Sequence, residues 1–179
     1  EMVESFFEDY QEGKRKNYLL YGITGSGKTE VFLHAIKNIL EKGGTALVLV
    51  PEIALTSQTL AGFEERFGNR VALTHSRMNA KERQRIYMRA KAGELSIVIG
   101  PRSAVFMPLP NLKLIVIDEA HDSSYKSEVD PKYHAIDIAR ERMRYHLGQV
   151  LLATATPSME TYYEVQNGAY DLLRLDKRI

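Results

Sequence analysis

The chain has 179 residues, a length typical of one globular domain that buries its own hydrophobic core. Hydrophobic residues make up 44% of the sequence and charged residues 26%, and a formal net charge of +1 does not by itself indicate a nucleic-acid partner. The absence of cysteine excludes a disulfide scaffold and a cysteine-ligated zinc site within these residues.

The first segment, EMVESFFEDYQEGKRKNY, starts abruptly in sequence typical of a helix and without an initiator methionine. We therefore expect a fragment of a longer protein. The segment does not resemble a signal peptide, and no apolar run in the chain is long enough to span a bilayer. These features favour a cytoplasmic protein without a membrane partner.

Short, continuous apolar runs alternate with helical patterns along the rest of the chain. The runs predict buried parallel strands at 18–22, 45–50, 95–100, 112–119 and 149–156, a sixth at 70–75 and a seventh, at an edge, at 171–175. Helices are predicted at 28–42, 54–67, 79–92, 134–146 and 158–167. This alternation indicates a single α/β domain, with a mostly parallel sheet and helices on both of its faces.

Residues 22–29, GITGSGKT, match the phosphate-binding pattern G-x-x-x-x-G-K-[ST] at every fixed position, between a predicted strand and a predicted helix. Glycines let the backbone turn tightly, so that N–H groups and the start of the helix face phosphate oxygens. Lys28 would reach the β and γ phosphates, and the Thr29 hydroxyl would bind Mg²⁺. The predicted nucleotide contacts are Gly22, Ile23, Thr24, Gly25, Ser26, Gly27, Lys28, Thr29 and Glu30.

The run LIVIDEAH places Asp118 and Glu119 at the predicted carboxyl end of a buried strand, where open α/β sheets bind ligands. Asp118 would hold Mg²⁺, and Glu119 would act as the general base toward the attacking water. His121 would hydrogen-bond toward the γ-phosphate or toward a neighbouring motif. Together with Lys28, we predict Glu119 and His121 as catalytic residues. A solvated strand end is the alternative, which the upstream phosphate loop disfavours.

Two further segments allow a structural and a functional interpretation. The connection 120–133 is long for a compact domain, and such loops are usually functional or mobile. The stretch 77–91 holds six basic residues and one acidic residue, which suits either a nucleic-acid groove or a solvated helix face.

The motifs GITGSGKTEVFL, PEIALTSQ, GPRSAVF, DEAHDSSYKS and TATPS together resemble the PriA family of replication-restart helicases, in helicase superfamily 2. The resemblance extends over about residues 18–179. It implies a RecA-like P-loop NTPase domain, the first of two motor domains. It also implies ATP-driven 3′-to-5′ DNA unwinding that restarts stalled forks. There are two alternatives. One is another superfamily 2 translocase or repair helicase, and the other is a binding module with a vestigial phosphate loop.

The resemblance also implies roles for residues outside the nucleotide site. It assigns DNA contacts to Thr56 of PEIALTSQ and to Arg102 and Ser103 of GPRSAVF. It assigns the coupling of hydrolysis to DNA movement to Thr154, Thr156 and Ser158. The segment after DEAH corresponds to a family loop that senses single-stranded DNA. In this chain the segment offers Tyr125, Lys126 and Tyr133 for base stacking and phosphate contact. The alternative is that both tyrosines are packed loop aromatics.

The partners implied by the resemblance are forked or single-stranded DNA, a second RecA-like domain, and other primosome and single-strand-binding proteins. The implied cofactors are ATP and Mg²⁺, with zinc in the full-length protein but not in this chain. An isolated first motor domain should bind Mg-ATP weakly, hydrolyse it poorly and fail to unwind DNA, because the second domain closes the site.

Overall fold

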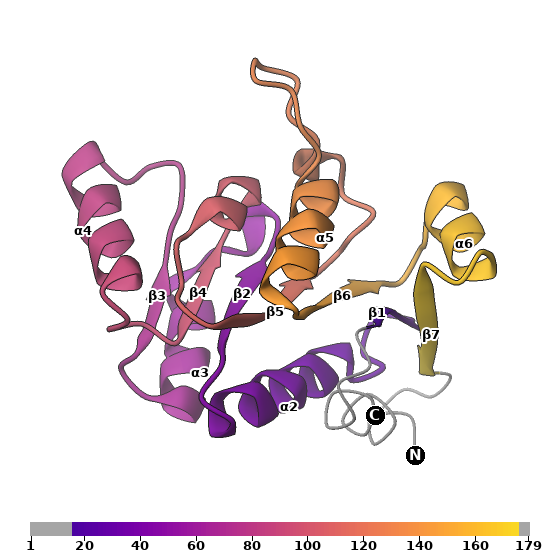
Figure 1. Cartoon of the computed structure of the whole chain (residues 1–179), viewed down its shortest axis with the longest axis horizontal. Coiled ribbons are helices and arrows are strands. Elements are labelled where there is room, and N and C mark those ends of the chain that lie inside the picture. The colour runs from indigo at the N-terminus through magenta and orange to yellow at the C-terminus, as the bar shows by residue number, and fades with distance from the viewer. Residues whose placement is uncertain (1–15, 176–179) are drawn as a thin grey trace.

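A seven-stranded sheet, parallel in every pairing, forms the centre of the computed structural model, which describes residues 16–175 (Figure 1). The strands follow the order β3-β4-β2-β5-β6-β1-β7 across the sheet. Their bounds are β1 (Asn17–Gly22), β2 (Thr45–Leu49), β3 (Val71–Leu73), β4 (Ile97–Gly100), β5 (Leu112–Ile117), β6 (Gln149–Thr154) and β7 (Tyr170–Leu175). The α/β fold class and the edge position of the last strand are confirmed.

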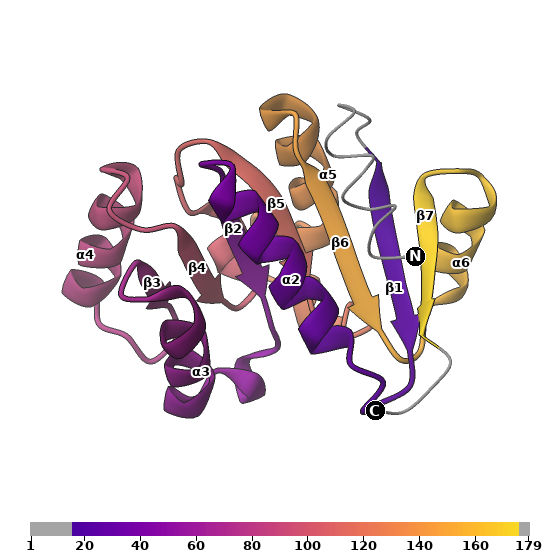
Figure 2. The ribbon, with the colours of Figure 1, turned by 90° about the horizontal axis from the view of Figure 1, so that it is seen from below.

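Helices cover both faces of the sheet, as Figures 1 and 2 show. One face carries α2 (Lys28–Glu41) and α3 (Ser57–Phe67), and the other carries α4 (Ala80–Lys91), α5 (Ala135–His146) and α6 (Met159–Gln166). Short 3-10 turns stand at η1 (Glu52–Ala54), η2 (Arg102–Phe106) and η3 (Ser123–Tyr125). None of the helices in the described part of the chain is long and apolar enough to cross a membrane.

Two hydrophobic clusters fill the space between the sheet and its helices, because strand side chains alternate between the faces. On β5, Leu114 and Val116 pack into the cluster beneath α2, and Ile115 and Ile117 pack into the cluster beneath α5. All four side chains are fully buried. Burial on both faces explains why the strands are continuous apolar runs rather than alternating ones.

Several predicted boundaries shift by a few residues. The predicted helix 54–67 begins as an α-helix only at Ser57, because the Thr56 side chain accepts the Thr59 N–H and caps it. The predicted strands 112–119 and 149–156 end at Ile117 and Thr154. The helix expected at the start of the chain lies outside the described residues.

Candidate nucleotide site and nucleic-acid groove

The segments that follow β1, β5 and β6 emerge at one edge of the sheet. The register pairs Tyr21 of β1 with Thr154 of β6, and Ile117 of β5 with Leu152 of β6. The three strands are parallel neighbours, so their carboxyl ends lie together. The phosphate loop after β1 and the carboxylates after β5 therefore share this edge, which is where α/β sheets bind ligands.

The phosphate loop has the backbone shape of an anion site. Gly25 and Gly27 have φ angles of 80° and 84°, in the left-handed region that favours glycine. The Ser26 N–H donates to the Ile23 carbonyl oxygen at 3.1 Å and closes the turn. Helix α2 begins at Lys28, so its first N–H groups, which have no acceptor within the helix, lie at the loop.

Lys28 lies inside this loop with 7% of its surface exposed. Its Nζ donates to the carbonyl oxygens of Gly22 at 2.7 Å and Ile23 at 3.2 Å. An ammonium has three N–H donors, so one donor remains for a phosphate oxygen, and two can be redirected. The other predicted nucleotide contacts with side chains, Ile23, Thr24, Thr29 and Glu30, are exposed at the loop or at the start of α2.

The phosphate loop requires glycine at its first position and contains a buried hydroxyl without a partner. A Cβ added at Gly22 would lie 2.5 Å from Ser26 Oγ and 2.9 Å from Leu175 Cβ, so this position has no room for one. Ser26 Oγ is buried and has no hydrogen-bond partner among the described residues. A buried hydroxyl without a partner costs free energy. A phosphate oxygen bound in the loop would supply that partner.

The two carboxylates follow β5 in a strained turn. The Asp118 N–H donates to the Leu49 carbonyl at 2.9 Å, and the Ala120 N–H donates to the Ala153 carbonyl at 2.9 Å. Between these two anchors Glu119 has a φ of 46°, which is uncommon for a residue with a side chain and is typical of functional sites. The Glu119 N–H donates to Asp118 Oδ1 at 3.0 Å. The turn therefore fixes both carboxylates relative to the sheet edge.

Burial raises the pKa of the Asp118 carboxyl above its usual value. The hydrogen bond from the Glu119 N–H lowers this pKa, and the Glu119 charge raises it. The charge of Lys28, and that of His121 when it is protonated, also lower this pKa, but burial outweighs them.

We expect Asp118→Asn to raise the melting temperature of the nucleotide-free protein at neutral pH. Because the folded-state pKa is raised, ionised Asp118 costs stability at pH values above that pKa. This cost disappears as the pH falls toward the unfolded value of 3.8. Thermal denaturation from about pH 8 to about pH 4 should therefore show a difference that shrinks with acidification.

Asp122→Asn is the matched control for this prediction. A hydrogen bond with Ser124 lowers the pKa of Asp122, so its ionised form stabilises the fold above the unfolded pKa. Its removal should lower the melting temperature at neutral pH, opposite in sign to Asp118→Asn. A melting temperature for Asp118→Asn at or below that of the wild type would contradict the raised pKa of Asp118 in the folded protein.

His121 joins the acidic motif to the end of β6. Its Nδ1 lies 2.8 Å from Thr154 Oγ1 and 3.5 Å from Glu119 Oε2. Thr154 Oγ1 also accepts the Thr156 N–H at 3.1 Å. Of the two contacts predicted for His121, the structure contains the one with a neighbouring motif. A contact with the γ-phosphate stays a prediction.

Tyr125 is a packed residue, and a base-stacking role does not fit its position. Its side chain is fully buried, and its hydroxyl, which has one proton to donate, lies 2.5 Å from the Asp118 carbonyl oxygen and 3.1 Å from the Leu49 carbonyl oxygen. The ring therefore has no free face for a base. The alternative interpretation, a packed loop aromatic, holds for Tyr125, which links the 120–133 connection to the end of β5.

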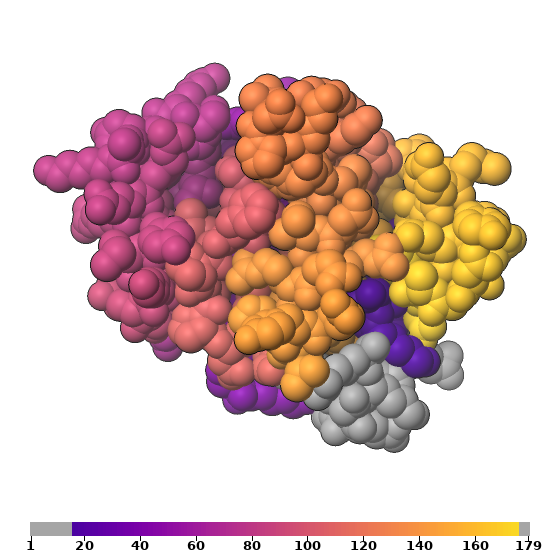
Figure 3. Space-filling view, turned by 45° about the horizontal axis from the view of Figure 1, so that its top comes forward, coloured from indigo at the N-terminus to yellow at the C-terminus, as the bar shows by residue number. Residues whose placement is uncertain are grey.

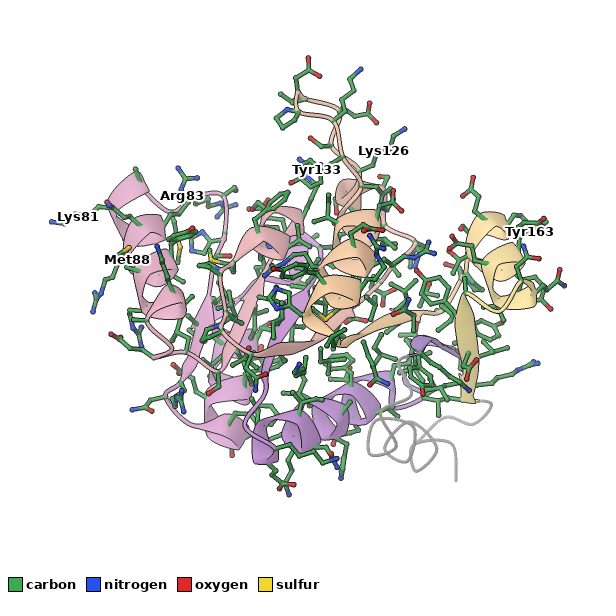
Figure 4. All side chains as sticks on the ribbon, in the orientation of Figure 1. Lys81, Arg83, Met88, Lys126, Tyr133 and Tyr163 are labelled. Atoms are coloured by element: carbon green, nitrogen blue, oxygen red, sulfur yellow. The ribbon has the colours of Figure 1, made fainter. Side chains whose placement is uncertain are left out.

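A groove of about 340 Å³ opens at the same edge, over the ends of β2, β3 and β4. Figure 3 shows the surface hollowed between α4 and the segment that projects before α5. Figure 4 shows Arg83 on one side and Tyr133 on the other. The groove is lined by Glu52, Thr74, His75, Ser76, Arg83, Pro101, Arg102, Ser103, Met107, Ser124 and Tyr133.

Arg102 organises one wall of this groove. It donates to the carbonyl oxygens of Ser124 at 3.0 Å and Lys126 at 2.5 Å, and its Cζ lies 5.7 Å from the centre of the Tyr133 ring. The Tyr133 ring also meets Phe106 edge-on, with centroids 5.2 Å apart. The wall thus presents a guanidinium and a half-buried aromatic ring, groups that suit phosphate and base contact.

The remaining residues predicted to contact DNA or to couple hydrolysis to movement have defined local roles. Thr56 Oγ1 accepts the Thr59 N–H at 3.1 Å and caps α3, and Ser158 Oγ accepts the Thr161 N–H at 3.1 Å and caps α6. Lys126 is exposed at the base of the projecting segment. Contacts of these residues with DNA stay predictions.

The family model for DEAD/DEAH box helicases matches residues 4–165 of the sequence. The chain belongs to the DEAD/DEAH box helicase family. Members of this family use nucleotide and Mg²⁺, which agrees with the fit of the phosphate loop.

Curated relatives of this helicase chain include replication restart proteins PriA from several bacteria. The Bacillus subtilis protein is 44% identical over 176 residues, which covers 98% of this chain and 22% of the relative. The Haemophilus influenzae protein is 47% identical over 161 residues, covering 90% of this chain and 22% of the relative. The chain thus spans less than a quarter of the length of these two relatives.

Solved helicase structures share the fold. The Hef helicase domain of Pyrococcus furiosus superposes with a TM-score of 0.68 at 21% identity, covering 99% of this chain and 38% of that one. RecG bound to a three-way DNA junction gives a TM-score of 0.68 at 22% identity, covering 99% of this chain and 24% of that one. These likenesses confirm the RecA-like fold of a helicase domain.

Two charged groove residues of this helicase domain, Glu52 and Arg83, could not be singled out from the sequence. Glu52 lies within PEIALTSQ, and its Oε1 accepts the Ser76 N–H at 2.7 Å. Hydrogen bonding with the Ser76 side chain, and then with this N–H, lowers the pKa of the Glu52 carboxyl. Arg83 was one of six basic residues in 77–91, and no local signal distinguished it from its neighbours. Of these six cations, Arg83 lines the groove, because α4 packs through Ala90 against the cluster that holds Ala72 of β3 and Val98 of β4.

Proposed function

We propose that the chain is the ATP-binding motor domain of a DNA helicase that restarts stalled replication forks. In this proposal the full-length protein unwinds DNA in the 3′-to-5′ direction, and a second RecA-like domain completes its ATP site. The observation that carries the proposal is the placement of Lys28, Asp118 and Glu119 after parallel strands at one sheet edge. The name of the curated relatives supports the restart function.

In the proposed reaction the phosphate loop holds the triphosphate through its N–H groups and through Lys28. The Lys28 ammonium exchanges the carbonyls of Gly22 and Ile23 for β and γ phosphate oxygens. Thr29 and Asp118 would hold Mg²⁺, which when bound neutralises charge developing on the phosphates. Glu119 orients the attacking water and accepts its proton. His121 contacts both Glu119 and Thr154, and so joins the acidic motif to the end of β6.

We propose that the groove binds one strand of DNA. Arg83 and Arg102 supply cations from opposite sides, His75 and Ser103 supply polar groups between them, and Tyr133 supplies a ring. Because the groove and the phosphate loop share a sheet edge, a strand in the groove would lie beside the ATP site. Contacts with primosome and single-strand-binding proteins, and a zinc site in the full-length protein, are further parts of the proposal that lie beyond these residues.

ATP turnover of the full-length protein with and without forked DNA tests the proposed function. We expect forked DNA to stimulate hydrolysis, and we expect Lys28→Ala to abolish the stimulated rate because the triphosphate loses its principal cation. Lys37→Ala, which changes an exposed lysine on the same helix, is the control and should leave the rate unchanged. An ATP hydrolysis rate that forked DNA does not change, or that Lys28→Ala does not reduce, would refute the proposal.

Arg83→Ala should weaken binding of single-stranded DNA and lower the slope of log affinity against log salt by about 1, the value for one lost phosphate contact. Fluorescence anisotropy at several salt concentrations measures both quantities. Arg85→Ala is the control, because Arg85 is exposed on the same helix but does not line the groove. Equal salt slopes for the two variants would remove Arg83 from the proposed DNA site.

A further inference from the structure

Helix α6 is attached to the domain by a small contact surface. It contains no buried residue, and its outer face exposes Met159, Tyr162 and Tyr163, the last of which is labelled in Figure 4. Val165 and the adjoining Ala169 pack, partly buried, against the core. Because these apolar contacts are few, the position of α6 depends largely on its polar contacts.

The start of α6 is tied to the nucleotide site. Ser158 caps the helix, and two residues earlier the Thr156 N–H donates to Thr154 Oγ1 at 3.1 Å. Thr154 in turn contacts His121 at 2.8 Å. A displacement of α6 would therefore pull on the segment that positions His121 beside Glu119.

An ion pair holds α6 against α5 at the other end of the helix. Arg140 Nη1 of α5 lies 2.7 Å from Glu164 Oε1 of α6, and the two side chains are 32% and 36% exposed. The Arg140 guanidinium also lies 5.4 Å from the centre of the buried Tyr170 ring at the start of β7. Arg140 thus joins α5, α6 and β7. Because both side chains of the ion pair are about two-thirds buried, water screens their attraction only partly.

Helix α5 begins at the wall of the groove. Its capping residue is His134, whose Nδ1 accepts the Ile136 N–H at 3.3 Å, and Tyr133 immediately before it lines the groove. Figure 1 shows α5 running down from the base of the projecting segment. A rigid helix therefore connects the groove wall to Arg140.

We propose that Arg140 and Glu164 are a positioning pair that transmits DNA binding in the groove to the nucleotide site. This inference rests on the proposed function. Neither side chain contacts the groove or the phosphate loop. The pair acts by keeping α5 and α6 in one arrangement, so that a change at Tyr133 reaches Thr154 and His121. Coupling of this kind requires a thermodynamic test, since spatial connection alone does not demonstrate it.

A double-mutant cycle in the full-length protein provides the test. Arg140→Gln and Glu164→Gln each remove one charge, and ATP turnover is measured with and without forked DNA. We expect each single variant to reduce the DNA-dependent stimulation by about two- to fivefold, the size expected for a partly exposed ion pair. The rate without DNA should stay unchanged. The double variant should resemble the single variants, because both act through the same contact.

Arg144→Gln is the matched control, since Arg144 lies one turn further along α5 and pairs with Glu141 of the same helix at 2.7 Å. It should leave the stimulation unchanged. Wild-type stimulation in both single variants, or single effects that multiply in the double variant, would overturn the inference. A parallel fall of both rates and of the melting temperature would also overturn it, because that result indicates a structural role only. Absence of stimulation in the wild type would instead refute the proposed function.

Discussion

Glu119→Gln is expected to reduce DNA-stimulated ATP turnover by about 10²- to 10⁴-fold, the range for loss of a general base. Glutamine has nearly the same shape as glutamate but cannot accept a proton from the attacking water. The backbone N–H of residue 119, which holds Asp118 Oδ1 at 3.0 Å, is retained. The metal-binding carboxylate should therefore keep its position, and nucleotide affinity should change little.

Two measurements on the full-length protein separate chemistry from binding. Steady-state hydrolysis with forked DNA gives the turnover, and titration with a fluorescent ATP analogue gives the affinity. Glu41→Gln is the control, because Glu41 is exposed at the end of α2 and pairs with Lys37 at 3.8 Å, away from both proposed sites. If Glu119→Gln reduces turnover by less than about tenfold, the loss is smaller than that expected for a general base. That result would show that another group activates the water.

Tyr125→Ala should lower the free energy of unfolding by about 3–5 kcal/mol, as for other large buried aromatic side chains. Tyr125→Phe keeps the ring and should cost about 1–3 kcal/mol, because the carbonyls of Asp118 and Leu49 lose a donor. The Asp118 carbonyl lies in the carboxylate turn directly after β5, so both variants should also lower turnover by loosening this turn.

Urea denaturation of the two variants measures these costs. Tyr133→Ala is the comparison, since the Tyr133 ring is only half-buried and should contribute less to stability. Conversely, DNA affinity should depend on Tyr133 and not on Tyr125. A Tyr125→Ala variant as stable as the wild type but deficient in DNA binding would restore the stacking role that burial argues against.

The sequence was sufficient to predict the parallel sheet, its edge strand and the phosphate loop. Those features depend on local signals: continuous apolar runs for strands buried on both faces, and glycines at fixed spacing before Lys28. The position of the carboxylates at a strand end was predictable for the same reason, because the apolar run stops at Asp118.

Three features that could not be predicted depend on contacts between residues far apart in the sequence. The strand predicted to reach Glu119 stops at Ile117, because Glu119 adopts a positive φ between two backbone anchors. The burial of Tyr125 depends on the Leu49 carbonyl, 76 residues away in the sequence. The orientation of Arg83 depends on how α4 packs. None of these contacts leaves a periodic pattern, so apolar spacing alone could not reveal them.

A crystal structure of the chain with Mg²⁺ and a non-hydrolysable ATP analogue tests the central claim most directly. We predict that the triphosphate occupies the loop 22–29, with Lys28 on its terminal phosphates. The metal should lie between the Thr29 hydroxyl and the Asp118 carboxylate, with Glu119 facing the terminal phosphate. A nucleotide bound elsewhere, or a metal without Asp118 in its surroundings, would contradict the motor interpretation.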